Sequence, residues 1–322
     1  MTAVASRAAG GPGDSKPSLK GKAARGSILA DKAATVVLWG TGVLVLAILG
    51  GIIVHFAMAA WGVVSLNFVF GDPSDTNLGG VFPVLWNSIY MLGLTMLIAV
   101  PVGILGGIYM AEYARETGIL GKLTTTIRFA EEAISSVPSI VVGLFGLILF
   151  VDNFKWGFTA LSGALALTFF NLPLMTRLAE QALRAVPQDE RSASLALGAT
   201  KWQTIRHVVL PLAIPGLITG VILTAGRVFG EAAVLLFTSG IGTPAHYNFM
   251  NFDLTSPASP WSPLRPATTL SVYIWKLNSE GLGAFKNQIV DGSAAILISM
   301  VLIFNLGARL LGRVLSRRLT AA

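Results

Sequence analysis

Cysteine is absent from the chain, and charged residues are scarce. Without cysteine the protein has no disulfide, no thiolate metal site and no cysteine nucleophile. The three histidines, His55, His207 and His246, lie far apart and show no metal-ligand spacing. Charged residues make up 12% of the 322 residues, whereas soluble domains contain about 25%. Since 53% of the residues are hydrophobic, the composition predicts a protein surrounded mainly by lipid.

A nucleotide-binding phosphate loop is also missing. The pattern G-x-x-x-x-G-K-[ST] does not occur. Gly121-Lys122 comes nearest, but Glu116 occupies the first glycine position and Leu123 follows the lysine. No intramembrane His/Asp/Glu cluster or Ser–Lys pairing suggests catalysis either. We therefore expect no catalytic, cofactor or metal site on this chain, and the chain is not expected to be an enzyme.

Long apolar runs are the main positive signal, because about 20 such residues span a bilayer as a helix. The first run contains Ala57-Met58-Ala59, which has the form of a signal-peptide cleavage site, but its apolar stretch is too long for one. The sequence thus predicts an all-α membrane protein with six transmembrane helices. They are expected at residues 35–60, 86–110, 134–152, 157–175, 212–237 and 293–312.

The distribution of Lys and Arg predicts the orientation of these spans. With a cytoplasmic N-terminus, 18 of the 23 basic residues are cytoplasmic, four are external and Arg227 lies within a span. Both termini are then cytoplasmic, and the net charge of +7 reflects topology, not nucleic-acid binding. Residues 1–34 are rich in Gly, Ser, Pro and Lys and are predicted to be a disordered basic tail. Residues 35–315 form the predicted six-span domain.

Two loops of this domain contain predicted short helices. The cytoplasmic loop 188–211 has Ala193, Ala196 and Leu197 in helical register, followed by Gly198, which permits a left-handed turn. A second short helix is expected to have Trp202, Ile205 and Val209 on its apolar side, before Pro211 starts the fifth span. In the external loop 238–292, the register of Leu270, Ile274 and Leu277 predicts another amphipathic helix, which either docks an external partner or caps the bundle.

The cytoplasmic loop resembles the coupling loop of ABC-importer permeases. Gly198 precedes Val208-Val209-Leu210-Pro211 at the family spacing of Gly, nine residues, Ile/Val, any residue, Leu, Pro. The family's preceding E-A-A falls on Ser192, Ala193 and Ser194, so only the central Ala is kept, and Glu190 is expected to replace the Glu. Without a partner, the loop would be an interfacial amphipathic helix pair. The resemblance implies ATPase-coupling roles for Glu190, Ala193, Leu197, Gly198, Ala199, Trp202, Leu210 and Pro211.

Three further segments resemble the phosphate-specific ABC transporter permeases: VPSIVVGLFG (137–146), NLPLMTRLAEQALRAVP (171–187) and GRVFGEAAVLLFTSG (226–240). PATTLSVYIWKLNSEG (266–281) is more similar to PstA-type than to PstC-type subunits. The resemblance implies the type-I permease fold in a prokaryotic plasma membrane. It also implies a PstC-type partner permease, a PstB-type ATPase dimer that binds ATP and Mg, and a PstS-type extracytoplasmic phosphate-binding protein.

Alternatives remain at this level. The oxyanion could be molybdate or sulfate, or the chain could be the PstC-type partner subunit. A secondary anion transporter is a more distant alternative, but inverted repeats, which often occur in that class, are not visible.

Charged and hydroxyl residues in or near the spans are the predicted substrate pathway. Arg227 lies about 10 residues from the predicted end of its span, and an intramembrane Arg usually faces a cavity or partner. Glu231, one helical turn further, is expected to hold the guanidinium until phosphate arrives, or to form a permanent packing pair. Arg177 and Glu180 form a second expected pair, a gate or an ordinary salt bridge. Ser139 is a further hydroxyl candidate, whereas Glu131-Glu132 fit a helix N-terminus without further function.

Overall fold

The computed structural model describes residues 20–73, 79–114, 118–242, 247–280 and 285–320. Within these ranges every regular element is helical and no β-strand occurs. The chain divides into two compact units, residues 1–55 and residues 56–322. Five helices are long and apolar enough to cross a membrane, and a bent helix pair provides a sixth span if it is counted as one. The predicted all-α membrane fold is therefore confirmed.

Helix α1 (Lys20–Ala59) contains the first span, Ala30–Ala59. The helix begins at Lys20, well before the predicted start of the span at residue 35. The cause is that residues 20–34 are rich in the helix formers Ala and Lys. The predicted disorder of residues 1–34 is thus wrong for residues 20–34, whereas residues 1–19 lie outside the described residues.

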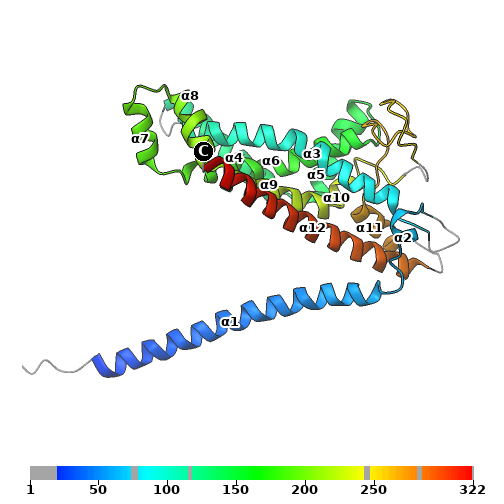
Figure 1. Ribbon diagram of the computed structural model, residues 1–322, viewed down its shortest axis with the longest axis horizontal. Helices are drawn as coiled ribbons and strands as arrows, with labels where there is room; N and C mark the ends of the chain where they lie inside the picture. Colours follow the sequence, from blue (N-terminus) through cyan, green and yellow to red (C-terminus); the bar gives the residue numbers. More distant parts are fainter. Residues whose placement is uncertain (1–19, 74–78, 115–117, 243–246, 281–284, 321–322) are drawn as a thin grey trace, which may run out of the picture. The chain divides into compact units, whose positions relative to one another are not determined.

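Four long helices of the second unit pack side by side: α3 (Phe82–Ile108), α6 (Ala160–Arg184), α9 (Leu210–Gly230) and α12 (Lys286–Thr320) (Figure 1). Glycines allow two of these contacts. A Cβ on Gly107 of α3 would lie 2.9 Å from the backbone nitrogen of Glu180, and one on Gly216 of α9 would lie 2.7 Å from Ala182 Cβ. Gly103 and Gly107, and likewise Gly216 and Gly220, are four residues apart in the sequence, and this spacing of small residues predicts both seams. By contrast, nothing lies within 4 Å of a Cβ placed on Gly230.

The third predicted span, 134–152, is not one straight helix. Helix α4 (Gly118–Ser136) ends before Pro138, and the chain then turns by 103° into α5 (Ser139–Gly146), which continues as the π-helical segment η2 (Leu147–Asn153). Proline has no backbone N–H and disfavours helical geometry in the residue before it, so the break at Val137-Pro138 has a local cause. Ser139 is the first residue of α5.

The fifth span ends earlier than the predicted residue 237. Helix α9 stops at Gly230, Glu231 is extended with ψ 122°, and a short helix, α10 (Ala233–Leu236), follows. Helix α5 packs closely against this interruption, because a Cβ on Gly143 would lie 2.9 Å from the Ala233 carbonyl oxygen. The two broken segments therefore meet inside the bundle.

The remaining elements gather at the two ends of the second unit (Figure 1). At one end lie α7 and α8, and at the other lie α2, α11 and the loop before α11. Helix α11 confirms the amphipathic helix predicted around residues 268–278. The bounds are α2 (Leu66–Phe70), η1 (Tyr109–Tyr113), α7 (Gln188–Ala196), α8 (Lys201–Thr204), η3 (Ile205–Val209) and α11 (Leu270–Glu280).

Candidate functional site

Arg227 is a cation on the apolar helix α9. It lies in the last turn of that helix, three residues before its end at Gly230, and is half-buried. Its guanidinium carbon lies 4.0 Å from the ring centroid of Phe170 on α6, which is a cation–π contact. Among the described residues no carboxylate forms an ion pair with Arg227. The positive charge is thus close to the helix bundle and is not paired with a carboxylate in the part of the chain that the structure describes.

The predicted pair of Arg227 with Glu231 does not form. Because α9 ends between them, the two side chains do not share a helical face. The Glu231 carboxylate accepts a hydrogen bond from the Val234 backbone N–H (3.3 Å) at the start of α10, and its carbonyl oxygen accepts one from the Ser271 hydroxyl (3.0 Å). Glu231 therefore stabilises the interrupted region instead of restraining Arg227.

A strongly polar cavity of about 470 Å³ lies between α4 and α6. It includes three arginines and three glutamates, so its lining can exchange ion-pair partners as well as bind an anion. The sequence prediction assigned Glu131 and Glu132 to a helix N-terminus, but they lie near the C-terminal end of α4. The lining residues are Arg128, Glu131, Glu132, Arg177, Glu180, Gln181 and Arg184.

Glu180 is the buried centre of this cavity, with 7% of its side chain exposed. Its carboxylate accepts hydrogen bonds from Arg128 (2.7 Å) and from Arg184 one turn along α6 (2.9 Å). Arg177, its predicted partner, instead lies 3.8 Å from the exposed carboxylate of Glu132. Arg177 and Glu180 line the same cavity, but the predicted ion pair between them is wrong. Glu180 instead forms ion pairs with Arg128 of α4 and with Arg184. The spacing of Glu180 and Arg184 was a sequence signal for one of these partners.

The predicted coupling loop consists of α7, a turn and α8. Gly198 has φ +83°, the left-handed conformation predicted for it. Thr200 and Gln203 form a reciprocal capping box that starts α8. Residues from α8 through α9 then form one helical run, so Leu210 and Pro211 lie in the fifth span and not in the loop. Ile205 and Val209 are buried as predicted, whereas Trp202 is 54% exposed.

Glu112 in η1 connects this loop to the bundle. Its carboxylate pairs with Arg191 of α7, and its carbonyl oxygen accepts a hydrogen bond from Lys201 of α8. Arg191 also donates to the Leu183 carbonyl oxygen (2.6 Å) at the end of α6. Only 13% of the Arg191 side chain and 9% of the Glu112 side chain are exposed. The sequence analysis missed Glu112, because its partners are about 80 to 90 residues away in the chain.

The outer surface of the coupling loop is apolar in part. Leu197 is 90% exposed, and Leu195 is 49% exposed. Glu190, Ala193 and Ala199 accompany them on α7 and in the turn, where Glu190 and Ala193 are exposed and Ala199 is partly buried. Exposed large apolar side chains on a short polar helix pair are typical of a docking surface.

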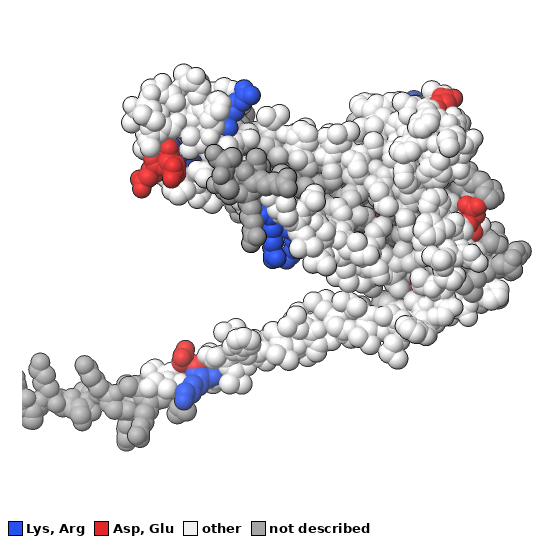
Figure 2. Space-filling view, viewed as in Figure 1, with Lys and Arg blue, Asp and Glu red and all other residues white. Residues whose placement is uncertain are grey.

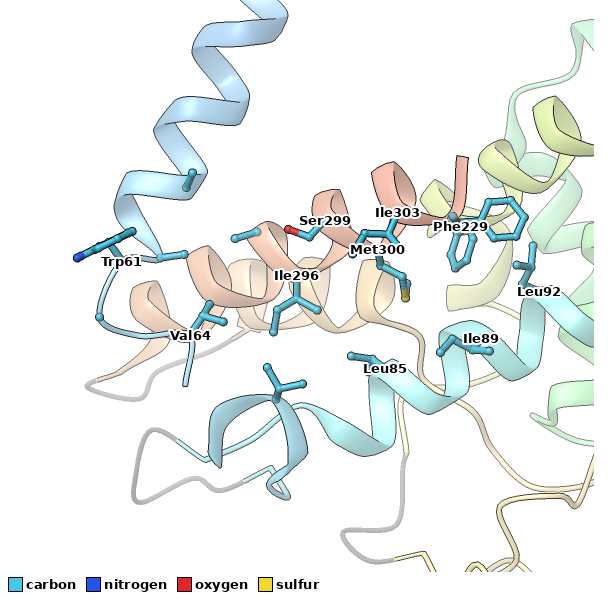
Figure 3. Close-up of a pocket in the computed structure, with 16 residues that line it drawn as sticks. Trp61, Val64, Leu85, Ile89, Leu92, Phe229, Ile296, Ser299, Met300 and Ile303 are labelled. Carbon is cyan, nitrogen blue, oxygen red and sulfur yellow. The ribbon is translucent and has the colours of Figure 1, made fainter. Parts of the chain in front are cut away.

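A larger cavity, of about 950 Å³, lacks the chemistry of an anion site. Figure 3 shows Leu85 and Ile89 of α3 on one side and Ile296 and Met300 of α12 on the other. Ser299 is the lone hydroxyl residue in a lining that contains no charged side chain. This cavity suits apolar groups and does not extend the polar pathway.

Arg265, in the loop before α11, is fully buried and was also missed by the sequence analysis. It donates to the Tyr247 hydroxyl (2.7 Å) and to the Pro260 carbonyl oxygen (2.9 Å). The Tyr247 hydroxyl in turn donates to Asn87 of α3 (3.0 Å). Burial lowers the pKa of Arg265 and raises the pKa of Tyr247. This network fastens the loop to the bundle.

Comparison with known proteins identifies relatives across most of the chain. A probable ABC transporter permease protein of Bacillus subtilis, YqgI, is 46% identical over 296 residues, covering 91% of this chain and 98% of that protein. The phosphate transport system permease protein PstA 1 of Mycobacterium tuberculosis is 33% identical over 240 residues, covering 74% of this chain and 73% of that protein. The PstA protein of Haemophilus influenzae is 31% identical over 258 residues, or 79% of this chain and 84% of that protein.

Solved structures share the fold at low sequence identity. A bacterial alginate ABC transporter chain aligns with a TM-score of 0.61 at 15% identity, covering 90% of this chain and 97% of that one. A chain of the MetNI methionine ABC transporter aligns with a TM-score of 0.52 at 20% identity, covering 73% and 94%. Residues 103–321 match the family described as binding-protein-dependent transport system inner membrane component. The chain, with its several membrane-spanning helices and its helical loop between α6 and α9, belongs to this family of inner-membrane ABC transporter permeases.

Proposed function

We propose that the chain is the permease subunit of an ATP-driven phosphate importer. It forms half of the translocation pathway and couples through α7 and α8 to an ATPase on a separate chain. ATP and Mg bind that ATPase, a second, PstC-type permease completes the pathway, and an extracytoplasmic binding protein delivers phosphate. Both termini and the coupling loop are cytoplasmic in this proposal. The PstA relatives support the choice of phosphate, although YqgI has no substrate in its name.

The single observation that supports this proposal best is Arg227. An arginine on a membrane-spanning helix is costly unless it serves a cavity or a partner. Here the guanidinium lies against the Phe170 ring without a carboxylate partner among the described residues. Its planar fork matches two phosphate oxygens. We infer that phosphate neutralises Arg227 during passage.

The cavity between α4 and α6 fits a later step of phosphate passage, after the contact with Arg227. It lies toward the coupling-loop end of α6, where Arg184 also donates to the Met110 carbonyl oxygen (3.1 Å) of η1. Arg128 and Arg184 share Glu180, so an arriving phosphate can take one guanidinium while the other stays paired. Arg177, held by a long and exposed pair, is the arginine most easily released. We infer that this cavity forms the exit of the phosphate pathway. The hydroxyl of Ser139, at the start of α5, is proposed as a further contact for phosphate.

The coupling proposal rests on the surface and anchoring of α7 and α8. Leu197 and Trp202 project exposed apolar surface, which an ATPase groove can bury. Arg191 and Lys201 both bind Glu112, so a displacement of the loop is transmitted to η1 and α3. Ser194 and Thr204 join α7 to α8 by a hydroxyl hydrogen bond of 2.9 Å. This bond links the two helices directly, and we expect them to move together.

The test is uptake of labelled phosphate by cells whose importer contains Arg227→Ala, measured beside sulfate uptake. Losing a charge-assisted contact of about 1.5–3 kcal/mol lowers apparent phosphate affinity roughly 10- to 100-fold. Lys276→Ala on α11 is the control and keeps normal uptake. ATPase activity of the purified complex verifies assembly, and Arg227→Lys, which keeps the charge, recovers part of the uptake. Normal phosphate uptake by the Arg227→Ala importer would contradict the role of Arg227 in the pathway. Uptake of sulfate instead of phosphate by the wild-type importer would contradict phosphate as the substrate.

A further inference from the structure

A second basic cavity, of about 330 Å³, lies between α9 and α12 and is used by neither the pathway nor the coupling loop. Arg309 and Arg313 of α12 line it, together with the apolar side chains of Pro215, Ile218, Ile222 and Leu223 of α9. No acidic residue belongs to this lining. The cavity therefore combines two permanent positive charges with apolar walls.

The helix geometry brings both guanidinium groups to one place. Arg309 and Arg313 are four residues apart, so they lie on one face of α12 about 6 Å apart along its axis. Between them, Gly312 allows α12 to approach α9 closely, since a Cβ there would lie 2.7 Å from Ile218 Cγ2. The arginines thus flank the helix contact and border the cavity beside it.

The surroundings of the cavity are those of a lipid-facing surface. Leu223 of α9 is 50% exposed, and Leu310 and Leu306 of α12 are 52% and 63% exposed. Figure 2 shows a group of basic side chains over the C-terminal part of α12, next to a broad uncharged surface. A small hydrated anion matches only the arginines. An amphiphile with an anionic headgroup matches both the arginines and the apolar walls.

The position along the bundle fits a headgroup. Pro215 and Ile218 lie in the first half of α9, which follows the coupling loop directly, and Arg309 and Arg313 lie in the last turns of the span Lys286–Val314. The cavity therefore extends from the surface end of the α12 span to about the middle of α9. Basic pockets between transmembrane helices at this depth attract anionic lipid headgroups.

We propose that the cavity between α9 and α12 binds an anionic phospholipid, with its phosphate on Arg309 and Arg313 and its acyl chains along the apolar surface of the two helices. The lipid bridges the helix that continues the coupling loop and the last span. Its occupancy stabilises this helix pair.

The experiment measures lipid retained by the full-length chain in neutral detergent, using native mass spectrometry with dioleoyl-phosphatidylglycerol or dioleoyl-phosphatidylcholine as probe. We expect at least a tenfold preference for phosphatidylglycerol. The double variant Arg309→Gln/Arg313→Gln loses this preference. The matched control Lys276→Gln/Lys286→Gln removes the same charge at the opposite end of α12 and on α11, and it keeps the preference.

A second variant separates the cavity from general surface charge. Thr219→Phe places a ring in the cavity and leaves both arginines in place, so we expect it to lower phosphatidylglycerol retention severalfold. Equal retention of both lipids, unchanged preference in the arginine double variant, or displacement of the lipid by millimolar inorganic phosphate overturns the proposal. Loss of the bound lipid when the complete transporter assembles also overturns it, because the partner permease would then occupy the surface.

Discussion

Arg265 is a buried cation whose partners are neutral oxygens and aromatic rings. Its guanidinium carbon lies 4.5 Å from the Tyr247 ring centroid and 5.4 Å from that of Tyr90. Burying a charge is costly unless hydrogen bonds compensate it. The hydroxyl of Tyr247 accepts one such bond from Arg265 and donates its own to the side-chain oxygen of Asn87, which is fully buried. The Tyr247 hydroxyl therefore links the buried cation of the loop to α3.

Tyr247→Phe is expected to destabilise the chain by about 1–3 kcal/mol, because Arg265 and Asn87 each lose a buried partner. Thermal unfolding of the detergent-solubilised protein measures this loss. Tyr113→Phe, an exposed tyrosine on η1, is the control and changes stability by about 0.5 kcal/mol or less. Equal unfolding temperatures for wild type and Tyr247→Phe would show that the hydroxyl contributes nothing.

The same residue predicts a dependence of stability on pH. Burial raises the pKa of Tyr247 in the folded chain above the ordinary value near 10. Its contribution to stability is thus complete below pH 10 and decreases as pH rises from 10 to the folded pKa, because the unfolded chain ionises first. Unfolding measured at several pH values above 10 should show the wild type losing stability faster than Tyr247→Phe. Parallel curves would contradict the pKa assignment.

At the scale of elements, close helix packing depends on where glycine permits it. Gly103 and Gly107 allow α3 to contact α6, and Gly143 allows α5 to reach the interruption after α9. The Gly103/Gly107 spacing was readable in the sequence, because residues four apart share a helix face. The role of Gly143 was not, because it depends on two helix breaks meeting in space. Pro138 indicated a kink but not its angle of 103°.

Gly107→Ala is expected to cost about 1–3 kcal/mol, because the added carbon meets the backbone of α6, which cannot move aside easily. Gly93→Ala on the same helix is the matched control, since nothing lies within 4 Å of its Cβ. That control is neutral or slightly stabilising, because alanine favours the helix. Midpoints of thermal unfolding compare the two, and equal midpoints would mean that the α3–α6 contact is looser than the structure indicates.

At the scale of the whole molecule, Glu112 and Arg191 join the coupling loop to the bundle. Breaking a nearly buried ion pair leaves an uncompensated charge and costs about 3–5 kcal/mol. Glu112→Arg and Arg191→Glu are each expected to abolish transport, whereas the double variant restores part of it. Uptake and ATPase activity measured together test this prediction. If the double variant is as inactive as the single ones, the residues act separately.

The absence of cysteine permits a direct test of the orientation of the chain. Ser192→Cys places a thiol on the exposed surface of α7, and Thr255→Cys places one in the exposed loop before α11. We expect a membrane-impermeant maleimide to label Thr255→Cys in intact cells and Ser192→Cys only after permeabilisation. The wild type, having no cysteine, provides the background. The reverse labelling pattern would invert the proposed topology.

The sequence by itself determined the features that depend only on residues near one another in the chain. Apolar length marked the membrane spans, glycine spacing marked the α3–α6 seam, and the register of Leu270, Ile274 and Leu277 marked α11. The turn at Gly198 was equally local. These features were readable because helix periodicity and bilayer thickness act on neighbouring residues.

The tertiary structure alone decided which charges meet. Glu180 pairs with Arg128 and not with Arg177, and Arg227 contacts Phe170 and not Glu231. Arg265, 18 residues from Tyr247, and Glu112, 79 residues from Arg191, likewise find their partners through the packing of distant helices and loops. Side-chain electrostatics act across space over a few ångströms, and sequence spacing specifies such distances only within one unbroken helix.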